Sequence, residues 1–153
     1  MTPARLPKAI ADDGGNLLLD HVVVVVADLD RAVEQLSIVF GRPAMLGGDE
    51  VLGYRYAVFI LGSSGLRIEV CQPLAPGDAG GDSQASRAFR NRLERFGEGL
   101  HCLAFTVENL ERARAVAHHG AARLIESEHS ESFFLHPGDM AGVLVQLLAA
   151  RAR

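Results

Sequence analysis

Four side chains that can bind a metal or carry a proton stand at matching positions in two similar halves of the sequence. His21 opens a run of five valines, and Cys102 stands at the equivalent place in a second apolar segment. Glu69 and Gln146 each follow a glycine by four residues in two further similar segments. An imidazole and a carboxylate in a shared, partly buried setting cost free energy unless they are paired, solvated or bound to a metal. These four residues therefore form a candidate site.

Each of the four residues also has a structural interpretation. His21 at the start of a strand is accounted for by a hydrogen bond, and Glu69 by an ion pair with a neighbouring arginine. Cys102 fits the usual role of a cysteine as a small buried apolar residue, and Gln146 fits a bond to the backbone. Taken singly, each residue favours the structural interpretation. Their matched positions favour a functional role for His21 and Glu69.

The elements that position these residues come from an internal duplication. The segment DHVVVVVADLDRA (20–32) aligns without a gap with HCLAFTVENLERA (101–113). Both predict a strand, a turn and a helix, with Asp28 and Asn109 capping the helix by accepting backbone N–H bonds. The predicted helices cover about 30–40 and 110–119, and the second should end at Gly120 in a left-handed conformation.

Each half then continues with three predicted strands, so that each reads β-α-β-β-β. The strands are expected near 43–47, 54–61, 66–71, 122–127, 132–136 and 142–148. A further helix over 83–96 follows the turn-rich PLAPGDAGGD linker.

The predicted fold class is α+β, with two tandem βαβββ modules that form a curled mixed sheet around a central cleft. The modules span about 17–74 and 100–149 of one domain at 17–149, with the helical linker at 75–99. Residues 1–16 are expected to form a flexible tail. Strand alternation places the His21 side chain on one face with those of Arg67, Glu69 and Cys71, and the intervening valines against the helix. In the second copy Cys102 takes this face, so His101 would bind a metal only by turning to the other face.

Composition excludes several classes of function. The chain has 153 residues, a net charge of −4 and no tryptophan, which disfavours nucleic-acid binding. The N-terminus lacks the apolar core of a signal peptide, and no apolar run reaches the roughly 20 residues of a membrane span. Two cysteines in apolar strands give no disulfide framework and favour a reducing compartment, so we expect a cytoplasmic protein.

Three segments carry a resemblance to a known family: LDHVVVVVADLDRAV, FGEGLHCLAFTVENLERA and FFLHPGDMAGVLVQLL. They resemble the vicinal oxygen chelate superfamily, which includes glyoxalase I, bleomycin-resistance proteins, extradiol dioxygenases and methylmalonyl-CoA epimerases. Within it the sequence is most similar to the epimerases, and the similarity covers about 17–149.

The resemblance implies a metal site at four strand positions, here His21, Glu69, Cys102 and Gln146. The family has a second histidine in place of Cys102 and a glutamate in place of Gln146. Nitrogen and oxygen ligands suit an octahedral divalent ion such as cobalt, nickel or manganese, whereas a thiolate would shift the preference towards zinc. The two departures leave open whether a metal is bound at all.

The resemblance also implies an enzyme that removes the proton next to the carbonyl of an acyl-CoA or a related small molecule. Gln146 cannot titrate, so Glu69 and Glu50 are the remaining acid–base candidates. A one-base isomerase, a lyase or a metal-free reaction fits these residues better than a faithful epimerase. Homodimers are common in the superfamily, and we expect one here.

Two other functions remain open. One is a metal-free relative that binds or tailors a hydrophobic small molecule, and the other is a duplicated scaffold for assembly. The arginines at 87, 90, 92 and 95 lie on one predicted helix, either as a site for coenzyme A phosphates or, as charged helix faces usually are, in solvent.

Overall fold

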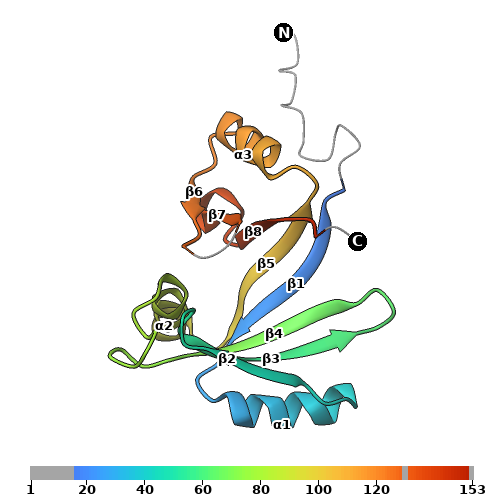
Figure 1. Ribbon diagram of the computed structural model, residues 1–153, viewed down its shortest axis with the longest axis vertical. Helices are drawn as coiled ribbons and strands as arrows, with labels where there is room; N and C mark the ends of the chain where they lie inside the picture. Colours follow the sequence, from blue (N-terminus) through green and yellow to red (C-terminus); the bar gives the residue numbers. More distant parts are fainter. Residues whose placement is uncertain (1–15, 129–130, 152–153) are drawn as a thin grey trace. The chain divides into compact units, whose positions relative to one another are not determined.

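The computed structural model describes residues 16–128 and 131–151, so most of the predicted tail lies outside the described residues (Figure 1). The α+β class and the tandem β-α-β-β-β order are confirmed. The elements are β1 (Leu18–Val25), α1 (Leu29–Phe40), β2 (Met45–Asp49), β3 (Tyr54–Leu61), β4 (Leu66–Pro73), α2 (Gln84–Phe96), β5 (Gly99–Val107), α3 (Leu110–His119), β6 (Leu124–Glu126), β7 (Ser132–Leu135), a short 3-10 helix (Pro137–Asp139) and β8 (Leu144–Ala149).

The chain divides into two compact units. The first unit spans Asp20–Cys102, and the second combines the described residues before Asp20 with those after Cys102. The linker helix α2 and the beginning of β5 therefore belong to the same unit as the first βαβββ module.

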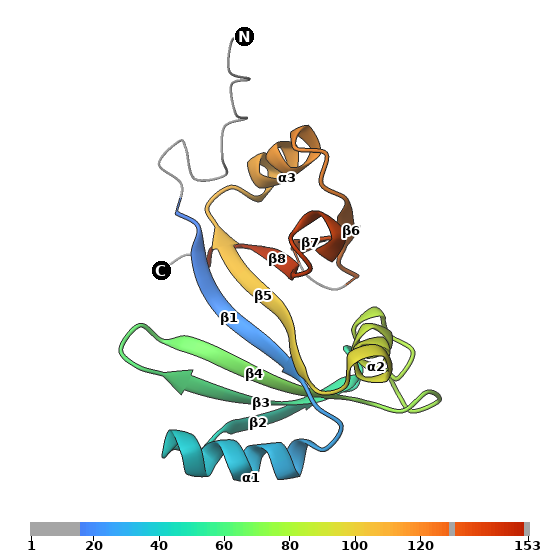
Figure 2. The same cartoon turned by 180° about the vertical axis from the view of Figure 1, so that it is seen from behind.

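In the first unit the strands lie in the order β2-β3-β4-β1. The β2–β3 and β3–β4 pairs are antiparallel, and β1 runs parallel to β4. Helix α1 lies along one face of this sheet, as both views show (Figures 1 and 2). The core between them holds Val26, Leu29, Ala57, Phe59 and Val70, with the partly buried Val24 packed against it. The prediction that alternate valines of β1 face the helix is confirmed.

In the second unit the order is β5-β8-β7-β6, and both the β6–β7 and β7–β8 pairs are antiparallel. The core between these strands and α3 holds Val107, Ala113, Ala117, Phe133, Leu135, Val145 and Leu147, with Phe105 packed against it. Phe105 and Val107 thus face the helix, as alternation along β5 predicts. No helix in the described ranges is long and apolar enough to cross a membrane.

The two predicted helix caps form with the same geometry. The Asp28 carboxylate accepts a hydrogen bond from the backbone N–H of Arg31 at 3.0 Å, and the Asn109 side chain accepts from Arg112 at 2.8 Å. The duplicated sequence therefore produces duplicated local structure.

The prediction of a left-handed Gly120 is wrong. Gly120 has φ −77°, and the positive φ falls on the next residue, Ala121, at 56°. The N–H of Gly120 bonds the carbonyl of Val116, and the observed bounds of α3 agree with the predicted helix over 110–119.

Candidate functional site

The candidate site begins with the pairing of β1 and β4. Their register places His21 opposite Arg67, Val23 opposite Glu69 and Val25 opposite Cys71. Because directly paired residues of neighbouring strands share a face, these side chains lie on the face away from α1. The predicted common face of His21 and Glu69 is therefore present.

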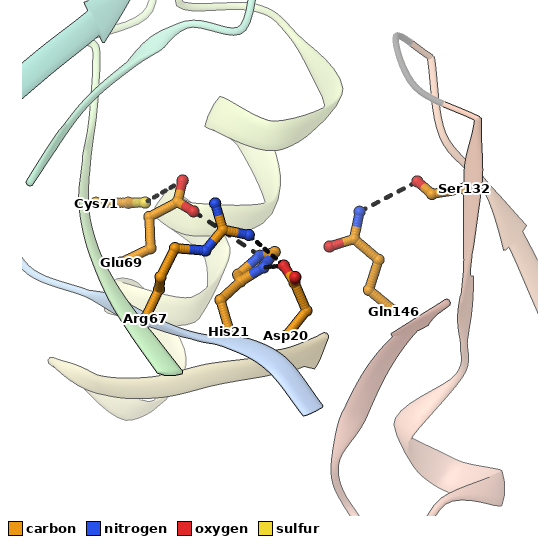
Figure 3. Close-up of polar contacts among 7 residues, drawn as sticks. All are labelled: Asp20, His21, Arg67, Glu69, Cys71, Ser132 and Gln146. Carbon is orange, nitrogen blue, oxygen red and sulfur yellow. Dashed lines mark hydrogen bonds and ion pairs between the residues drawn. The ribbon is translucent and has the colours of Figure 1, made fainter. Parts of the chain in front are cut away.

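On this face, contacts connect two carboxylates, an imidazole and a guanidinium (Figure 3). Asp20 Oδ2 lies 2.7 Å from Nδ1 of His21 and also accepts from the Arg67 guanidinium. On the other side of the ring, His21 Nε2 lies 3.8 Å from Glu69 Oε2. The His21 side chain is 12% exposed and that of Glu69 is 22% exposed, so the carboxylate is partly accessible to solvent.

Asp20 fixes the state of the His21 ring. Burial alone would raise the pKa of Asp20, but the hydrogen bond with His21 and the charge of Arg67 outweigh it and lower the pKa. An ionised carboxylate only accepts hydrogen bonds, so Nδ1 of His21 carries a hydrogen. The lone pair of the neutral ring then lies on Nε2, on the side of Glu69.

The second oxygen of Glu69 faces Cys71. The Cys71 thiol lies 3.9 Å from Glu69 Oε1, and the side chain is 1% exposed. Burial raises the pKa of Cys71 far above its usual value, and the nearby charge of Glu69 raises it further. Cys71 therefore stays a thiol, able to donate a weak hydrogen bond to Glu69 but unsuited to act as a thiolate nucleophile.

Cys102 and His101, the residues of the second copy, have surroundings unlike those of His21. Cys102 is 1% exposed in β5. The His101 ring packs edge-on against Phe89 of α2, with 5.0 Å between ring centroids. Burial, together with the charge of Arg92, lowers the pKa of His101 to about 4. His101 is thus a packed, neutral histidine, in agreement with the alternation argument.

Gln146 belongs to the second unit. Its Nε2 donates to Ser132 Oγ across β8 and β7 at 3.1 Å (Figure 3). The structural interpretation of Gln146 expected a hydrogen bond to the backbone, whereas this amide bonds a side-chain hydroxyl. The contact fixes the orientation of the amide and directs its carbonyl oxygen away from Ser132.

Glu50 lies exposed in the turn after β2. The register places Asp49 opposite Tyr54 and Tyr54 opposite Pro73, which is four residues along β4 from Glu69. With a rise of about 3.3 Å per residue and about 4.8 Å between strands, the end of β2 lies about 16 Å from Glu69. The structure thus brings His21 and Glu69 together and leaves Glu50 at the far end of the sheet.

Two of the metal ligands that the resemblance implies lie together in the first unit. His21 Nε2 and Glu69 Oε2 are two donors of suitable type, 3.8 Å apart. Over residues 16–128 and 131–151, no group of three or more His, Cys, Asp or Glu side chains is placed to hold a metal ion.

A family model for the glyoxalase-like domain matches residues 19–147. The chain belongs to the glyoxalase-like domain family. The predicted resemblance to the vicinal oxygen chelate superfamily is thereby confirmed. No match was found among the curated proteins.

Solved structures similar to this glyoxalase-like chain include two methylmalonyl-CoA epimerases. A Streptomyces coelicolor epimerase variant in complex with 2-nitronate-propionyl-CoA is 26% identical, with a TM-score of 0.69 over 90% of this chain and 100% of that one. The Mycobacterium tuberculosis epimerase is 25% identical, with a TM-score of 0.68 over 97% and 94%. A hypothetical protein from Bacillus halodurans C-125, 20% identical with a TM-score of 0.72 over 90% and 97%, shows the fold alone.

The arginines of α2 in this glyoxalase-like chain mostly bind its own backbone. Arg90 donates to the carbonyls of Leu74 at 2.8 Å and Gly81 at 2.5 Å. Arg92 donates to Leu100 at 3.1 Å and Gly97 at 3.0 Å, and Arg87 donates to Asp82. The donors of Arg90 and Arg92 thus bond backbone carbonyls that come before and after α2 in the sequence, and the choice between a solvated face and a coenzyme A site stays a prediction.

Sequence reasoning missed Asp20 as a member of the site. Strict alternation assigns it to the face opposite His21, yet its carboxylate turns to contact the His21 ring. The available signal was the acid directly before the histidine, together with Arg67 at the paired position of β4.

Proposed function

We propose that this chain is an enzyme that enolises an acyl-CoA or related carbonyl substrate, with Glu69 as the base. The observation that carries the proposal is the Asp20–His21–Glu69 array, in which a partly exposed carboxylate lies beside an oriented imidazole. The glyoxalase-like family match and the acyl-CoA analogue bound to the Streptomyces epimerase support this substrate class.

In the proposed reaction, Glu69 takes the proton from the carbon next to the carbonyl. The C–H bond breaks and its electron pair forms the C=C bond of the enolate, while the π pair of the carbonyl moves onto its oxygen and an O–H bond forms on Glu69. His21 Nε2, 3.8 Å away, is then the nearest basic nitrogen that can share this proton. Asp20 stabilises the imidazolium that would form, since it already accepts from Nδ1.

A single base predicts exchange of the α-hydrogen more directly than inversion of the carbon. Inversion requires an acid on the opposite side of the enolate, and Glu50 follows the end of β2, which is level with Pro73 at the end of β4 rather than with Glu69. Glu50 as the second acid therefore stays a prediction, as does a divalent metal at His21, Glu69, Cys102 and Gln146. When bound, such an ion would stabilise the enolate oxygen.

Deuterium exchange tests the proposal. Methylmalonyl-CoA and the uncharged 2-methylbutanoyl-CoA are incubated with the protein in deuterated water, with and without cobalt, nickel, manganese or zinc, and the α-hydrogen is followed by NMR. We expect Glu69→Gln to reduce the exchange rate by about 10²–10⁴-fold, the usual contribution of a general base.

The matched control is Glu34→Gln, the same substitution at an exposed site on α1. It should exchange at the wild-type rate. Glu50→Gln decides whether a second acid takes part. If the wild-type protein exchanges neither substrate under any of these conditions, or if Glu69→Gln keeps full activity, the proposal is wrong.

A second candidate is a metal-free relative that binds a hydrophobic small molecule without enolising it. Exposed apolar side chains on the Glu69 face favour it, with Met45 57% and Ile60 41% exposed. Binding measured by calorimetry without any exchange would support this candidate. Stoichiometric metal in protein purified without chelators would count against it.

A further inference from the structure

An apolar strip lies directly beside Glu69 on the same face of the first unit. It consists of Met45, Tyr56, Val58 and Ile60. The register pairs Val58 with Glu69 on one side and with Met45 on the other, so all three share this face. Directly paired side chains have Cβ atoms about 5 Å apart. A substrate whose reacting carbon is at Glu69 would therefore place a neighbouring group against Val58.

The two ends of the strip lie on either side of Val58. Ile60 pairs with Arg67, and Tyr56 pairs with Cys71. Ile60 and Met45 are large apolar side chains that remain 41% and 57% exposed. They are available to a bound molecule, and burying them would release apolar surface from water.

Tyr56 leans away from Glu69. A Cβ atom placed on Gly47 would lie 2.4 Å from Cζ of Tyr56, so the ring lies over Gly47 on β2. Glycine at this position lets the ring lie on the β2 side of Val58, away from Glu69 on β4.

The charges of this face do not provide for an additional carboxylate. Glu69 and Asp20 are acids, and the guanidinium of Arg67 is already paired with Asp20. At the end of the strip, Arg42 donates to the carbonyl of Ile60 at 2.6 Å. A carboxylate of the substrate beside Glu69 would meet the like charges of Glu69 and Asp20. The guanidinium of Arg67 on this face is already paired with Asp20.

We infer that the acyl group of the substrate carries an uncharged, apolar substituent on its reacting carbon, which lies against Val58 and Ile60. This inference rests on the proposed function, because it takes Glu69 as the group at the reacting carbon. Such an acyl group differs from the methylmalonyl group, in which a free carboxylate takes the place of the apolar substituent.

The test compares two thioesters that differ in this substituent. The α-hydrogen exchange rates of 2-methylbutanoyl-CoA and methylmalonyl-CoA are measured under identical conditions, and their dissociation constants by calorimetry. We expect the uncharged thioester to be favoured at least tenfold in kcat/KM. Equal rates, or a preference for methylmalonyl-CoA, would overturn the inference and leave the proposed function intact.

If neither thioester exchanges, the proposed function is refuted together with the inference that rests on it. If exchange occurs, the dissociation constants must show the same preference for the uncharged thioester as the rates, and equal or weaker binding of that thioester overturns the inference.

Variants place a cation on the strip or away from it. Ile60→Arg adds a positive charge on the Glu69 face and should shift the preference towards methylmalonyl-CoA by at least tenfold. Leu46→Arg is the matched control, because Leu46 is 69% exposed on the same sheet but pairs with Ala57 on the opposite face. Met45→Arg repeats the test at a second strip position. An unchanged ratio in both strip variants would contradict the inference.

Discussion

His101 makes folding of this protein sensitive to acid. Its ring packs edge-on against Phe89, and burial lowers its pKa to about 4 from the model-compound value of 6.5. The unfolded chain therefore takes up a proton at a higher pH than the folded chain does. The stabilisation of the folded state is complete above pH 6.5 and is lost progressively as the pH falls from 6.5 towards 4.

The size of this loss follows from the two pKa values. At pH 5 an unfolded histidine is almost fully protonated, whereas the folded His101 is about one-tenth protonated. The resulting loss between pH 8 and pH 5 is about 2 kcal/mol. For a chain of this length, such a loss lowers the Tm by about 4–8 °C.

Urea denaturation at pH 8, 6.5 and 5 measures the effect. His101→Phe keeps an aromatic ring against Phe89 but cannot be protonated, so its unfolding free energy should fall by about 2 kcal/mol less than that of the wild type. His118→Gln, at the exposed C-terminal end of α3, is the matched control and should keep the wild-type pH dependence. Identical pH dependence in His101→Phe and the wild type would refute the assignment of a buried neutral His101.

Two further substitutions test packing and capping. Gly47→Ala places a Cβ 2.4 Å from Cζ of Tyr56 and should lower the unfolding free energy by about 1–3 kcal/mol, whereas Gly48→Ala, with 3.7 Å to its nearest neighbour, should not; equal effects in urea denaturation would exclude a close Tyr56 ring. Asp28→Ala and Asn109→Ala remove equivalent helix caps and should each cost about 1 kcal/mol, measured by thermal denaturation; no loss in either would show that these caps do not stabilise their helices.

Much of the candidate site could be predicted from the sequence because strand alternation is a local property. The spacing of the polar residues within β1 and β4 assigned His21 and Glu69 to one face, and the structure brings them to 3.8 Å. The role of Asp20 could not be predicted, because its carboxylate departs from the alternation of its strand. The position of Glu50 depends on the register of β2 on β3 and of β3 on β4, which the spacing of residues does not reveal.

The sequence by itself determined the βαβββ duplication, the two helix caps and the faces of the strands. Each depends on residues within a few positions of one another, where backbone geometry limits the options. The tertiary structure decided which distant groups meet: Arg67 with Asp20, Val58 with Glu69, and the α2 arginines with loop carbonyls. These contacts depend on strand register and helix packing, which burial of the whole core fixes and no single segment encodes.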